Sequence, residues 1–296
     1  MRISPLQLGA SLYVPAVRPD IAAVANGDRY PDLKSVILCT EDSILPGQLE
    51  AALHNLREGM PRIVMDRPLV FVRPRDPKTL ARIVAMRGVE QIDGFVLPKA
   101  TQESVVRFAE VAPERFLLMP TLETREMFDP SAVAALRKFL STPGLKERIL
   151  ALRIGGNDLL NLLGVRRRPG RTIYDTAVGL AVSSLVTAFR PFGFSLTAPV
   201  FDDFGDLDTL RREVARDLEH GLIGKTAIHP LQVAIIEREY RVDGRDLAMA
   251  RDILAHDAPA VFQVDQVMCE PATHIEWARS IIERFVIYGV VQSDDC

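Results

Sequence analysis

The stretch Arg115-Phe116-Leu117-Leu118-Met119-Pro120 is apolar on both of the faces that a β-strand would present. A second run, Val36-Ile37-Leu38, has the same character. Continuous apolar runs of this length are typical of strands that are buried on both sides, as in a parallel sheet covered by helices. The sequence therefore predicts interior parallel strands of an α/β fold.

These two runs belong to a series of eight short, mainly apolar segments along the chain. The eight segments alternate with longer amphipathic ones. The predicted strands are Leu8–Val14, Ser35–Cys39, Leu69–Arg73, Gly94–Pro98, Arg115–Pro120, Arg148–Ile154, Phe194–Val200 and Lys225–Ile228. The predicted helices between them are Gly47–Glu58, Pro77–Arg87, Gln102–Val111, Pro130–Leu140, Ile173–Phe189 and Leu207–Glu219. Asp76-Pro77 and Asp129-Pro130 are typical pairs of an N-cap and a first helical residue.

Eight strand–helix units in succession favour a closed (β/α)₈ barrel, the TIM barrel, over an open doubly wound sheet. The open sheet usually has fewer strands and a glycine-rich first turn. Here the first turn is Val14-Pro15-Ala16-Val17-Arg18-Pro19, which is rich in proline. We predict a TIM-barrel domain over residues 1–240. Residues 241–296, with helices near Arg245–His256 and Thr273–Tyr288, are predicted to form a C-terminal helical extension that acts as an oligomerisation arm.

Composition narrows the classes of function. The chain has 296 residues, 48% of them hydrophobic, and a formal net charge of −3. It therefore lacks the basic excess typical of nucleic-acid-binding proteins. No apolar run approaches the roughly 18 residues that a membrane span requires, and the first residues do not resemble a signal peptide. Three distant cysteines, Cys39, Cys269 and Cys296, indicate reduced thiols. We expect a cytoplasmic protein that binds neither nucleic acid nor membrane.

Polar residues that follow the predicted strands are the candidate site residues, because the active site of a TIM barrel lies at the carboxyl ends of its strands. Carboxylates packed together at one rim repel each other unless a cation neutralises them. Oxygen-only ligands then favour Mg²⁺, with Mn²⁺ as a further option. In strand order, the candidates are Glu41 and Asp42, Arg73, Lys99, Glu123, Gly155, Gly156 and Asp158, and His229.

Each of these residues also has an ordinary structural interpretation. Asp158 could cap the helix that follows it, Arg73 could pair with a surface acid, and His229 could cap the last turn. Their shared place at one end of the barrel favours a site. The basic run Arg166-Arg167-Arg168 with Arg171 is either an exposed turn or a loop at the barrel mouth. In the second case Arg167 and Arg168 would grip a phosphate or polycarboxylate group through paired hydrogen bonds.

The ordered set of segments resembles the HpcH/HpaI aldolase and citrate lyase beta-subunit family. The segments resemble family motifs as follows: Tyr13–Asp20 for VPGxRPD, Cys39–Asp42 for DLED, Phe71–Arg73 for the IRVN strand, Gly155–Leu159 for GAEDL and Gly224–Gln232 for GKxAIHPxQ, with Val96–Lys99 and Leu122–Thr124 between them. Two departures are Cys39-Thr40 at the start of the DLED segment and the segment 164–176. The latter resembles a stress- and tellurium-resistance-associated subgroup of C–C bond lyases of the TIM-barrel fold.

The resemblance implies roles for individual residues. It implies Mg²⁺ held by Glu123 and Asp158 together with water. Arg73 would polarise the substrate carbonyl and stabilise the enolate, and Glu41 and Asp42 would position water or support the metal. Residues assigned to substrate binding are Arg18, which would bind a carboxylate, and Lys99, Gly155, Gly156 and His229.

The resemblance also implies a function: metal-dependent cleavage or condensation, of aldol or Claisen type, of a 2-oxo or 3-hydroxy acid. The small carboxylate substrate can be a CoA thioester such as citryl-CoA or malyl-CoA. Two alternatives remain open at this point, namely a thioester hydrolase of the malyl-CoA type on the same scaffold and a non-catalytic barrel that binds a metabolite. A homo-oligomer, either a trimer or a hexamer, is expected.

Overall fold

The computed structural model describes residues 3–291 of the chain. The chain divides into two compact units, Met1–Ile235 and Ile236–Cys296. Each unit is described by itself below, and the first contains all of the candidate site residues.

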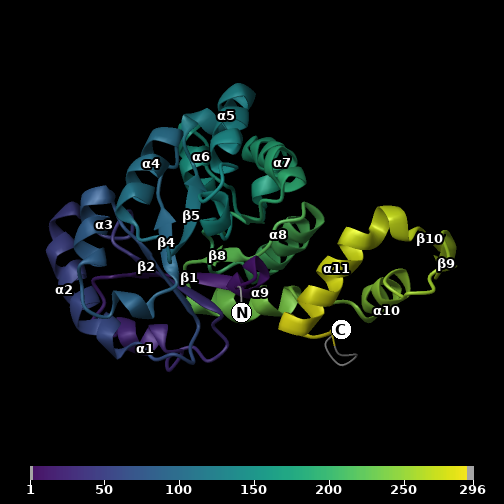
Figure 1. Ribbon diagram of the computed structural model, residues 1–296, viewed down its shortest axis with the longest axis horizontal. Coiled ribbons are helices and arrows are strands. Elements are labelled where there is room, and N and C mark those ends of the chain that lie inside the picture. Colours follow the sequence, from purple (N-terminus) through teal and green to yellow (C-terminus); the bar gives the residue numbers. More distant parts are fainter. Residues whose placement is uncertain (1–2, 292–296) are drawn as a thin grey trace. The chain divides into compact units, whose positions relative to one another are not determined.

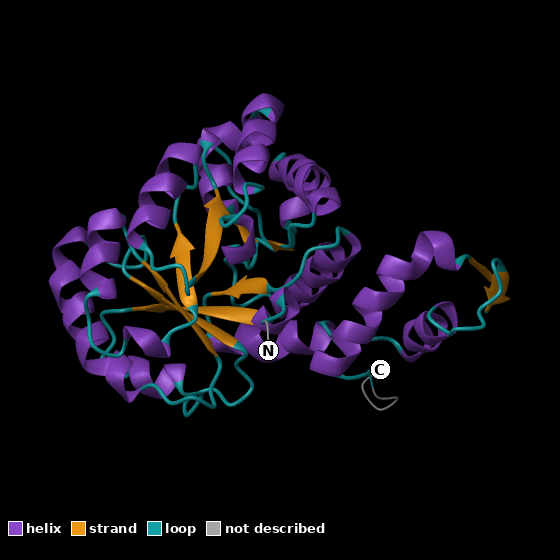
Figure 2. Cartoon of the chain, in the orientation of Figure 1, coloured by secondary structure: helices purple, strands orange, loops and turns teal. Residues whose placement is uncertain are grey.

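Parallel strands form the centre of the first unit, with helices outside them (Figure 2). Their spatial order is β7-β6-β5-β4-β3-β2-β1-β8. The two ends of this sheet meet at a parallel bridge between Ala198 and Lys225, where the Ala198 N–H donates to the Gly224 carbonyl at 2.9 Å. The strands thus close into the predicted TIM barrel. They are β1 (Ala10–Pro15), β2 (Ser35–Cys39), β3 (Leu69–Arg73), β4 (Gly94–Leu97), β5 (Leu117–Leu122), β6 (Leu152–Ile154), β7 (Leu196–Thr197) and β8 (Lys225–Ala227).

Amphipathic helices follow the strands and surround the barrel (Figure 1). Both predicted N-caps are confirmed, because the Asp76 carboxylate accepts from the Thr79 N–H at 2.7 Å and that of Asp129 accepts from the Ser131 N–H at 2.8 Å. Two helices, α1 and α9, were not predicted, and α6 was expected only as a helix that Asp158 could cap. The helices are α1 (Ile21–Ala25), α2 (Leu49–Gly59), α3 (Pro77–Val84), α4 (Gln102–Val111), α5 (Pro130–Leu140), α6 (Gly156–Leu162), α7 (Val178–Phe189), α8 (Leu207–Glu219) and α9 (Pro230–Glu239).

Several predicted segments are shorter in the structure than in the prediction, and in two of them a local turn accounts for the difference. The predicted strand Arg148–Ile154 is reduced to β6 because Lys146–Arg148 forms a 3₁₀ turn. The predicted helix Ile173–Phe189 begins as a separate 3₁₀ turn, Ile173–Asp175, in which the Thr172 N–H and hydroxyl donate to the Asp175 carboxylate at 2.8 and 2.9 Å. The hydrogen bonds from Thr172 to Asp175 thus close the 3₁₀ turn, and α7 begins separately at Val178.

The second unit contains two helices and a hairpin: α10 (Gly244–Ile253), β9 (Phe262–Val264), β10 (Val267–Cys269) and α11 (Pro271–Tyr288). The hairpin turns at Asp265 and Gln266, which both have positive φ (46° and 65°), as tight β-hairpin turns require. Residues of both helices, with the buried Cys269, form a small hydrophobic core. Helices therefore occur in the predicted C-terminal extension, while its role as an oligomerisation arm stays a prediction.

The remaining sequence-based expectations concern cysteines and membranes. Cys39 and Cys269 are buried free thiols, and Cys296 lies outside the described residues. Among residues 3–291, none of the helices has the length and apolar character needed to cross a membrane.

Candidate active site

The strand order brings the carboxyl ends of β2, β3, β4, β5 and β6 next to one another. Glu41 and Asp42 follow β2, Arg73 ends β3, Lys99 follows β4 and Glu123 directly follows β5. The parallel register places Cys39 beside Arg73 at the same level of the barrel. Side chains that are far apart in sequence therefore lie on one rim.

Arg73 is the central cation of this rim. Its side chain is only 9% exposed, and its Nη2 lies 2.7 Å from Glu41 Oε2 and 3.1 Å from Glu123 Oε1. Burial alone would lower the pKa of Arg73. The nearby Tyr13, Glu123 and Glu41 raise this pKa by a larger amount, so its net value lies above the ordinary one and the guanidinium stays charged. The alternative interpretation of Arg73, a pairing with a surface acid, describes only its longest contact, because Nη2 lies 3.5 Å from the exposed Asp42 carboxylate while its two shorter contacts are with the buried Glu41 and Glu123.

Lys99 connects the acidic pair after β2 with Glu123. Its Nζ lies 2.7 Å from Glu41 Oε1 and 3.2 Å from Asp42 Oδ2, while its backbone N–H donates to Glu123 Oε1 at 2.7 Å. Lys99 has a φ of 48°, a left-handed conformation that is uncommon for residues with a side chain. Burial lowers the pKa of Lys99, and the two carboxylates raise it to a value above the ordinary one. Asp42 is more exposed than Glu41, and its pKa is lowered because its contacts with Glu41 and Lys99 outweigh the effect of burial.

Glu123 is the carboxylate most affected by its surroundings. Burial raises its pKa, Arg73 lowers it and the neighbouring Asp158 raises it again, with a net value of about 7. Asp158 is the third residue of α6, the N-cap is Gly155, and the Asp158 carboxylate accepts no backbone hydrogen bond within residues 3–291. It does not cap the helix, which was its alternative interpretation. Two acids that repel each other in this way are suited to a shared cation.

Two glycines keep the space around Glu123 and α6 open. A Cβ on Gly155 would lie 2.3 Å from Glu123 Oε2 and 2.4 Å from Glu123 Cβ. A Cβ on Gly156 would lie 2.7 Å from both Ile173 and Pro199. The glycine pair therefore lets the start of α6 approach both the Glu123 carboxylate and the barrel wall.

A cavity of about 320 Å³ opens between these residues. Its wall includes Arg73, Glu123, Gly155, Gly156 and Asp158. Two buried polar atoms of its lining residues, Arg73 Nε and Thr121 Oγ1, have no hydrogen-bond partner among the described residues. No group of three or more His, Cys, Asp or Glu side chains in the described part of the chain is arranged to hold a metal ion. Glu123 and Asp158, which are close enough for Asp158 to raise the pKa of Glu123, fit a divalent ion whose remaining ligands come from water or substrate.

Arg18 and His229 do not line this cavity. The Arg18 guanidinium donates to both carboxylate oxygens of Asp20, at 2.9 and 2.7 Å. The His229 ring stacks on Phe204, with 5.0 Å between ring centroids, and its Nδ1 accepts from the Leu231 N–H at 3.3 Å. His229 thus contacts the start of α9, and its predicted part in substrate binding stays a prediction.

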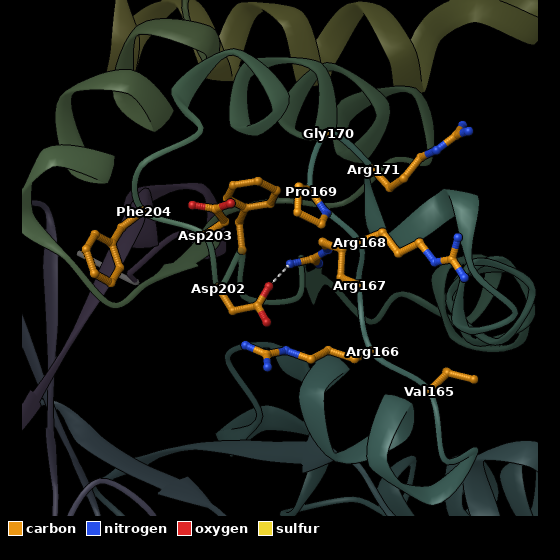
Figure 3. A pocket seen from close by; sticks show the side chains of 11 residues that line it. Val165, Arg166, Arg167, Arg168, Pro169, Gly170, Arg171, Asp202, Asp203 and Phe204 are labelled. Carbon is orange, nitrogen blue, oxygen red and sulfur yellow. Dashed lines mark hydrogen bonds and ion pairs between the residues drawn. The ribbon is translucent and has the colours of Figure 1, made fainter.

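The basic loop lines a second cavity, of about 830 Å³, together with residues 201–204 (Figure 3). Arg167 is buried there, and its guanidinium lies 2.5 Å from Asp202 and 3.2 Å from the buried Glu213. Arg168 and Arg171 extend away from that ion pair in the figure. Arg167 therefore holds the loop in place through these ion pairs. The predicted binding of an anionic ligand would then depend on Arg166, Arg168 and Arg171.

The cavity lining also contains polar side chains to which the sequence assigned no role: Tyr13, Ser43, Thr121, Arg153, Asn157 and Thr226. Arg153 lies inside β6, where the Leu152-Arg153-Ile154 stretch carries a charge in an otherwise apolar strand. Because arginine is almost never fully buried unless it has a partner, this anomaly was the available signal. Tyr13 and Thr121 gave no such signal, since both residue types are common in strands.

Comparison with known proteins agrees with this geometry. Residues 2–290 match the family described as C–C bond lyase of the TIM-barrel fold. The chain is 36% identical over 242 residues to the L-malyl-CoA/beta-methylmalyl-CoA lyase of Cereibacter sphaeroides, covering 74% of this chain and 76% of that protein. It is 25% identical over 247 residues to a (3S)-malyl-CoA thioesterase of the same species, covering 82% and 81%.

The crystal structure of CitE from Mycobacterium tuberculosis in complex with magnesium, acetoacetate and coenzyme A has the same fold. Its TM-score is 0.71 at 23% sequence identity, covering 94% of this chain and 98% of that one. The resemblance drawn from the motifs is thereby confirmed at the level of the family. From the match over nearly its whole length, the chain belongs to the C–C bond lyases of the TIM-barrel fold.

Proposed function

We propose that this protein uses Mg²⁺ to cleave or form a carbon–carbon bond next to a carboxylate, in a 2-oxo or 3-hydroxy acid. The observation that carries the proposal is the buried Glu123 carboxylate, with Asp158 close enough to raise its pKa. A buried carboxylate beside a second acid is costly to keep ionised, and a divalent ion offsets that cost. Mn²⁺ has the same ligand preference and is expected to substitute.

Arg73 is proposed to stabilise the charge that develops on the substrate oxygen. Its Nη2 is held by Glu41 and Glu123, while its buried Nε has no acceptor among the described residues. A fixed guanidinium with an unused donor is suited to bind an enolate oxygen. When bound, the metal ion would polarise the same oxygen as a Lewis acid.

Lys99, Glu41 and Asp42 are proposed to hold this arrangement in place. Glu41 contacts both Arg73 and Lys99 and therefore fixes two cations with one carboxylate. Asp42 also lines the cavity, where its lowered pKa keeps it ionised and able to orient water. The predicted roles of these residues in catalysis and substrate binding remain proposals.

The substrate is proposed to be a small carboxylate, either free or as a CoA thioester. Malyl-CoA lyase among the relatives and coenzyme A in the CitE complex support the thioester. A cavity of about 320 Å³ is too small for a whole CoA molecule, so the nucleotide part would extend beyond it. Val200 lines the smaller cavity, and the next residue, Phe201, lines the larger cavity that also contains the basic loop. The two cavities are therefore neighbours, and the arginines of the loop are proposed to bind the phosphate groups of the nucleotide part.

Thioester hydrolysis is the second candidate, because a malyl-CoA thioesterase is among the relatives. The two activities differ in products. Cleavage of malyl-CoA yields glyoxylate and acetyl-CoA, whereas hydrolysis yields malate and free CoA.

The experiment incubates the purified protein with Mg²⁺ and, separately, malyl-CoA, citryl-CoA, malate or citrate. We expect glyoxylate from the malyl substrates or oxaloacetate from the citryl ones, and no product when EDTA removes the metal. Malate and free CoA as the products of malyl-CoA would instead establish the hydrolase. Absence of turnover of any of these acids, with Mg²⁺ bound, would support a barrel that only binds its ligand.

A further inference from the structure

Arg153 is a buried cation without a counter-ion. The residue is 2% exposed and projects from β6 into the cavity. Its guanidinium donates to Thr226 Oγ1 at 2.6 Å and to Ser11 Oγ at 3.4 Å, and its Cζ lies 5.5 Å from the centroid of the Tyr13 ring. Within residues 3–291, no carboxylate lies at ion-pair distance from it. All of its protein partners are therefore neutral.

Elsewhere the chain pairs its buried cations with acids. A buried charge that lacks a partner is costly, so an exception suggests that the partner is supplied from outside the chain. The paired cations are Arg73 with Glu41 and Glu123, Arg167 with Asp202 and Glu213, and Lys225 with Glu213 and Asp217.

Thr121 provides a second polar group without a hydrogen-bond partner among the described residues, next to Arg153 in the sheet. The register of β5 and β6 pairs Thr121 with Arg153, and the buried Thr121 hydroxyl has no partner among the described residues. Both residues line the cavity. A guanidinium and a hydroxyl on neighbouring strands are donors that suit one carboxylate.

The position of Thr121 and Arg153 along their strands can be compared with that of Glu123. Glu123 follows Thr121 by two residues, so it lies on the same face of the chain, about 6–7 Å farther along the strand direction. A short diacid, with its carboxylate oxygens at both ends, can reach from one level to the other. One end of such an acid would lie near Arg73 and Glu123, and the other near Arg153.

The charge balance of the cavity agrees with an anionic ligand. Its lining contains three carboxylates, from Asp42, Glu123 and Asp158, and two guanidinium groups, from Arg73 and Arg153. With a divalent ion, the formal charge changes from −1 to +1. An enclosed positive site favours a negatively charged substrate.

We propose that Arg153 and Thr121 form an anion subsite on the floor of the cavity, which binds the second carboxylate of a short dicarboxylic substrate. The proposal rests on the proposed function, since it places the first carboxylate and the reacting carbon near Arg73. It assigns Arg153 to substrate specificity rather than to the bond-breaking step.

The test compares two ligands that differ by one carboxylate: malate, and 2-hydroxybutyrate, in which a methyl group replaces it. Isothermal titration with and without Mg²⁺ gives the affinity of each acid for wild type and Arg153→Met. Malate is expected to bind the wild type more tightly than 2-hydroxybutyrate. The substitution should weaken malate binding by about 30-fold or more, as loss of one partner of a buried charged pair does, and leave 2-hydroxybutyrate nearly unchanged.

Further variants separate this role from a structural one. Thr121→Val should weaken malate binding in the same selective way, and Thr121→Ser should restore it. Arg148→Met is the matched control, because the Arg148 guanidinium also donates to neutral groups, the carbonyls of Ala112, Pro113 and Phe116, and does not line the cavity. Without ligand, Arg153→Met should melt at the wild-type temperature or higher, because an uncompensated cation has been removed.

Several results would overturn the subsite. They are undetectable malate binding to the wild type, an equal loss of both acids in Arg153→Met, or an unchanged malate affinity. If Arg153→Met does not fold, Arg153→Lys and Thr121→Val apply the same comparison. The outcome is separable from the proposed lyase activity: selective malate binding that depends on Arg153 supports the subsite even if no carbon–carbon bond is cleaved.

Discussion

Replacing Glu123 by Gln keeps the shape of the side chain and removes its charge. We expect Glu123→Gln to abolish Mg²⁺ binding at millimolar concentrations, since one of the two proposed ligand carboxylates is lost. Isothermal titration with Mg²⁺ measures this directly. Glu126→Gln, which removes a charge from the loop after the same strand but not from the cavity lining, is the control and should bind Mg²⁺ like the wild type. Undiminished affinity in Glu123→Gln would refute the proposed metal site.

The raised pKa of Glu123 predicts a dependence of stability on pH. In the metal-free folded protein this carboxyl keeps its proton up to about pH 7, whereas its ordinary pKa is 4.5. The folded state therefore binds more protons than the unfolded chain between these values, and the contribution of Glu123 to the free energy of unfolding decreases as the pH rises from 4.5 to 7.

Mg²⁺ should reverse this loss, because it binds the ionised carboxylate. We expect the increase in melting temperature caused by Mg²⁺ to be small at pH 5 and largest above pH 7. Thermal melts with and without the metal across this range provide the measurement. The same melts of Glu123→Gln should lack the trend, and a Mg²⁺ effect that is independent of pH would contradict the assignment.

Arg73 tests the stabilisation of charge in the reaction. Arg73→Lys retains a positive charge but loses the planar guanidinium that contacts Glu41 and Glu123 and offers a free Nε. We expect kcat to fall by about 10²–10³, as it does when one donor to a developing oxyanion is removed. Steady-state kinetics with whichever of the four tested acids and thioesters is turned over provides the value. A wild-type kcat would leave Arg73 with a purely structural role.

At the scale of elements, the junction of β6 and α6 brings a helix start against Glu123. A Cβ on Gly155 would meet both the carboxylate and the Cβ of Glu123, and the latter cannot rotate away. Gly155→Ala should therefore lower the free energy of unfolding by about 1–3 kcal/mol, which is typical of overpacking, and weaken Mg²⁺ binding. Chemical denaturation and Mg²⁺ titration test both effects. Gly47→Ala is the control, because its added Cβ would meet nothing within 4 Å.

The elements that the sequence predicted well are those with sharp chemical boundaries. The bounds of β2, β3, α4, α5 and α8 agree with prediction, because each run ends at a capping, charged or turn residue. β7 is only two residues long, since barrel closure uses an isolated bridge beyond it that has no sequence signal. The start of the seven-residue helix α6 was not predicted, because it lies directly after β6 at a glycine pair that resembles a loop.

The sequence predicted those site residues whose position depends only on the order of the strands. Glu41, Arg73 and Glu123 come together because each lies at the end of its strand. The neutral environment of Arg153 depends on Ser11 and Thr226, from strands at opposite ends of the sequence, which no local pattern reveals. The burial of Arg167 depends in the same way on acids 35 and 46 residues away.

At the scale of the whole molecule, the second unit is the place to test for association. Val286 lies on α11 and is 75% exposed, and the hairpin residues Val267 and Met268 are also exposed. If this unit is the oligomerisation arm, Val286→Lys should shift the protein from a trimer or hexamer towards the monomer at micromolar concentration, because a charge would be buried in the contact. Sedimentation velocity measures the change. A wild-type monomer, or an unchanged oligomer in the variant, would contradict the predicted arm.

The pairing of β1 with β8 has a consequence for synthesis of the chain. Ala10–Leu12 pairs with Lys225–Ala227, so one edge of β1 has no partner until more than two hundred further residues have been made. At about 5–20 residues per second, ribosomal elongation leaves that edge open for roughly 10 to 40 s. During this interval β1 can pair with a strand of another nascent chain. Closure by the final strand is thus the event that ends the period of greatest risk of aggregation.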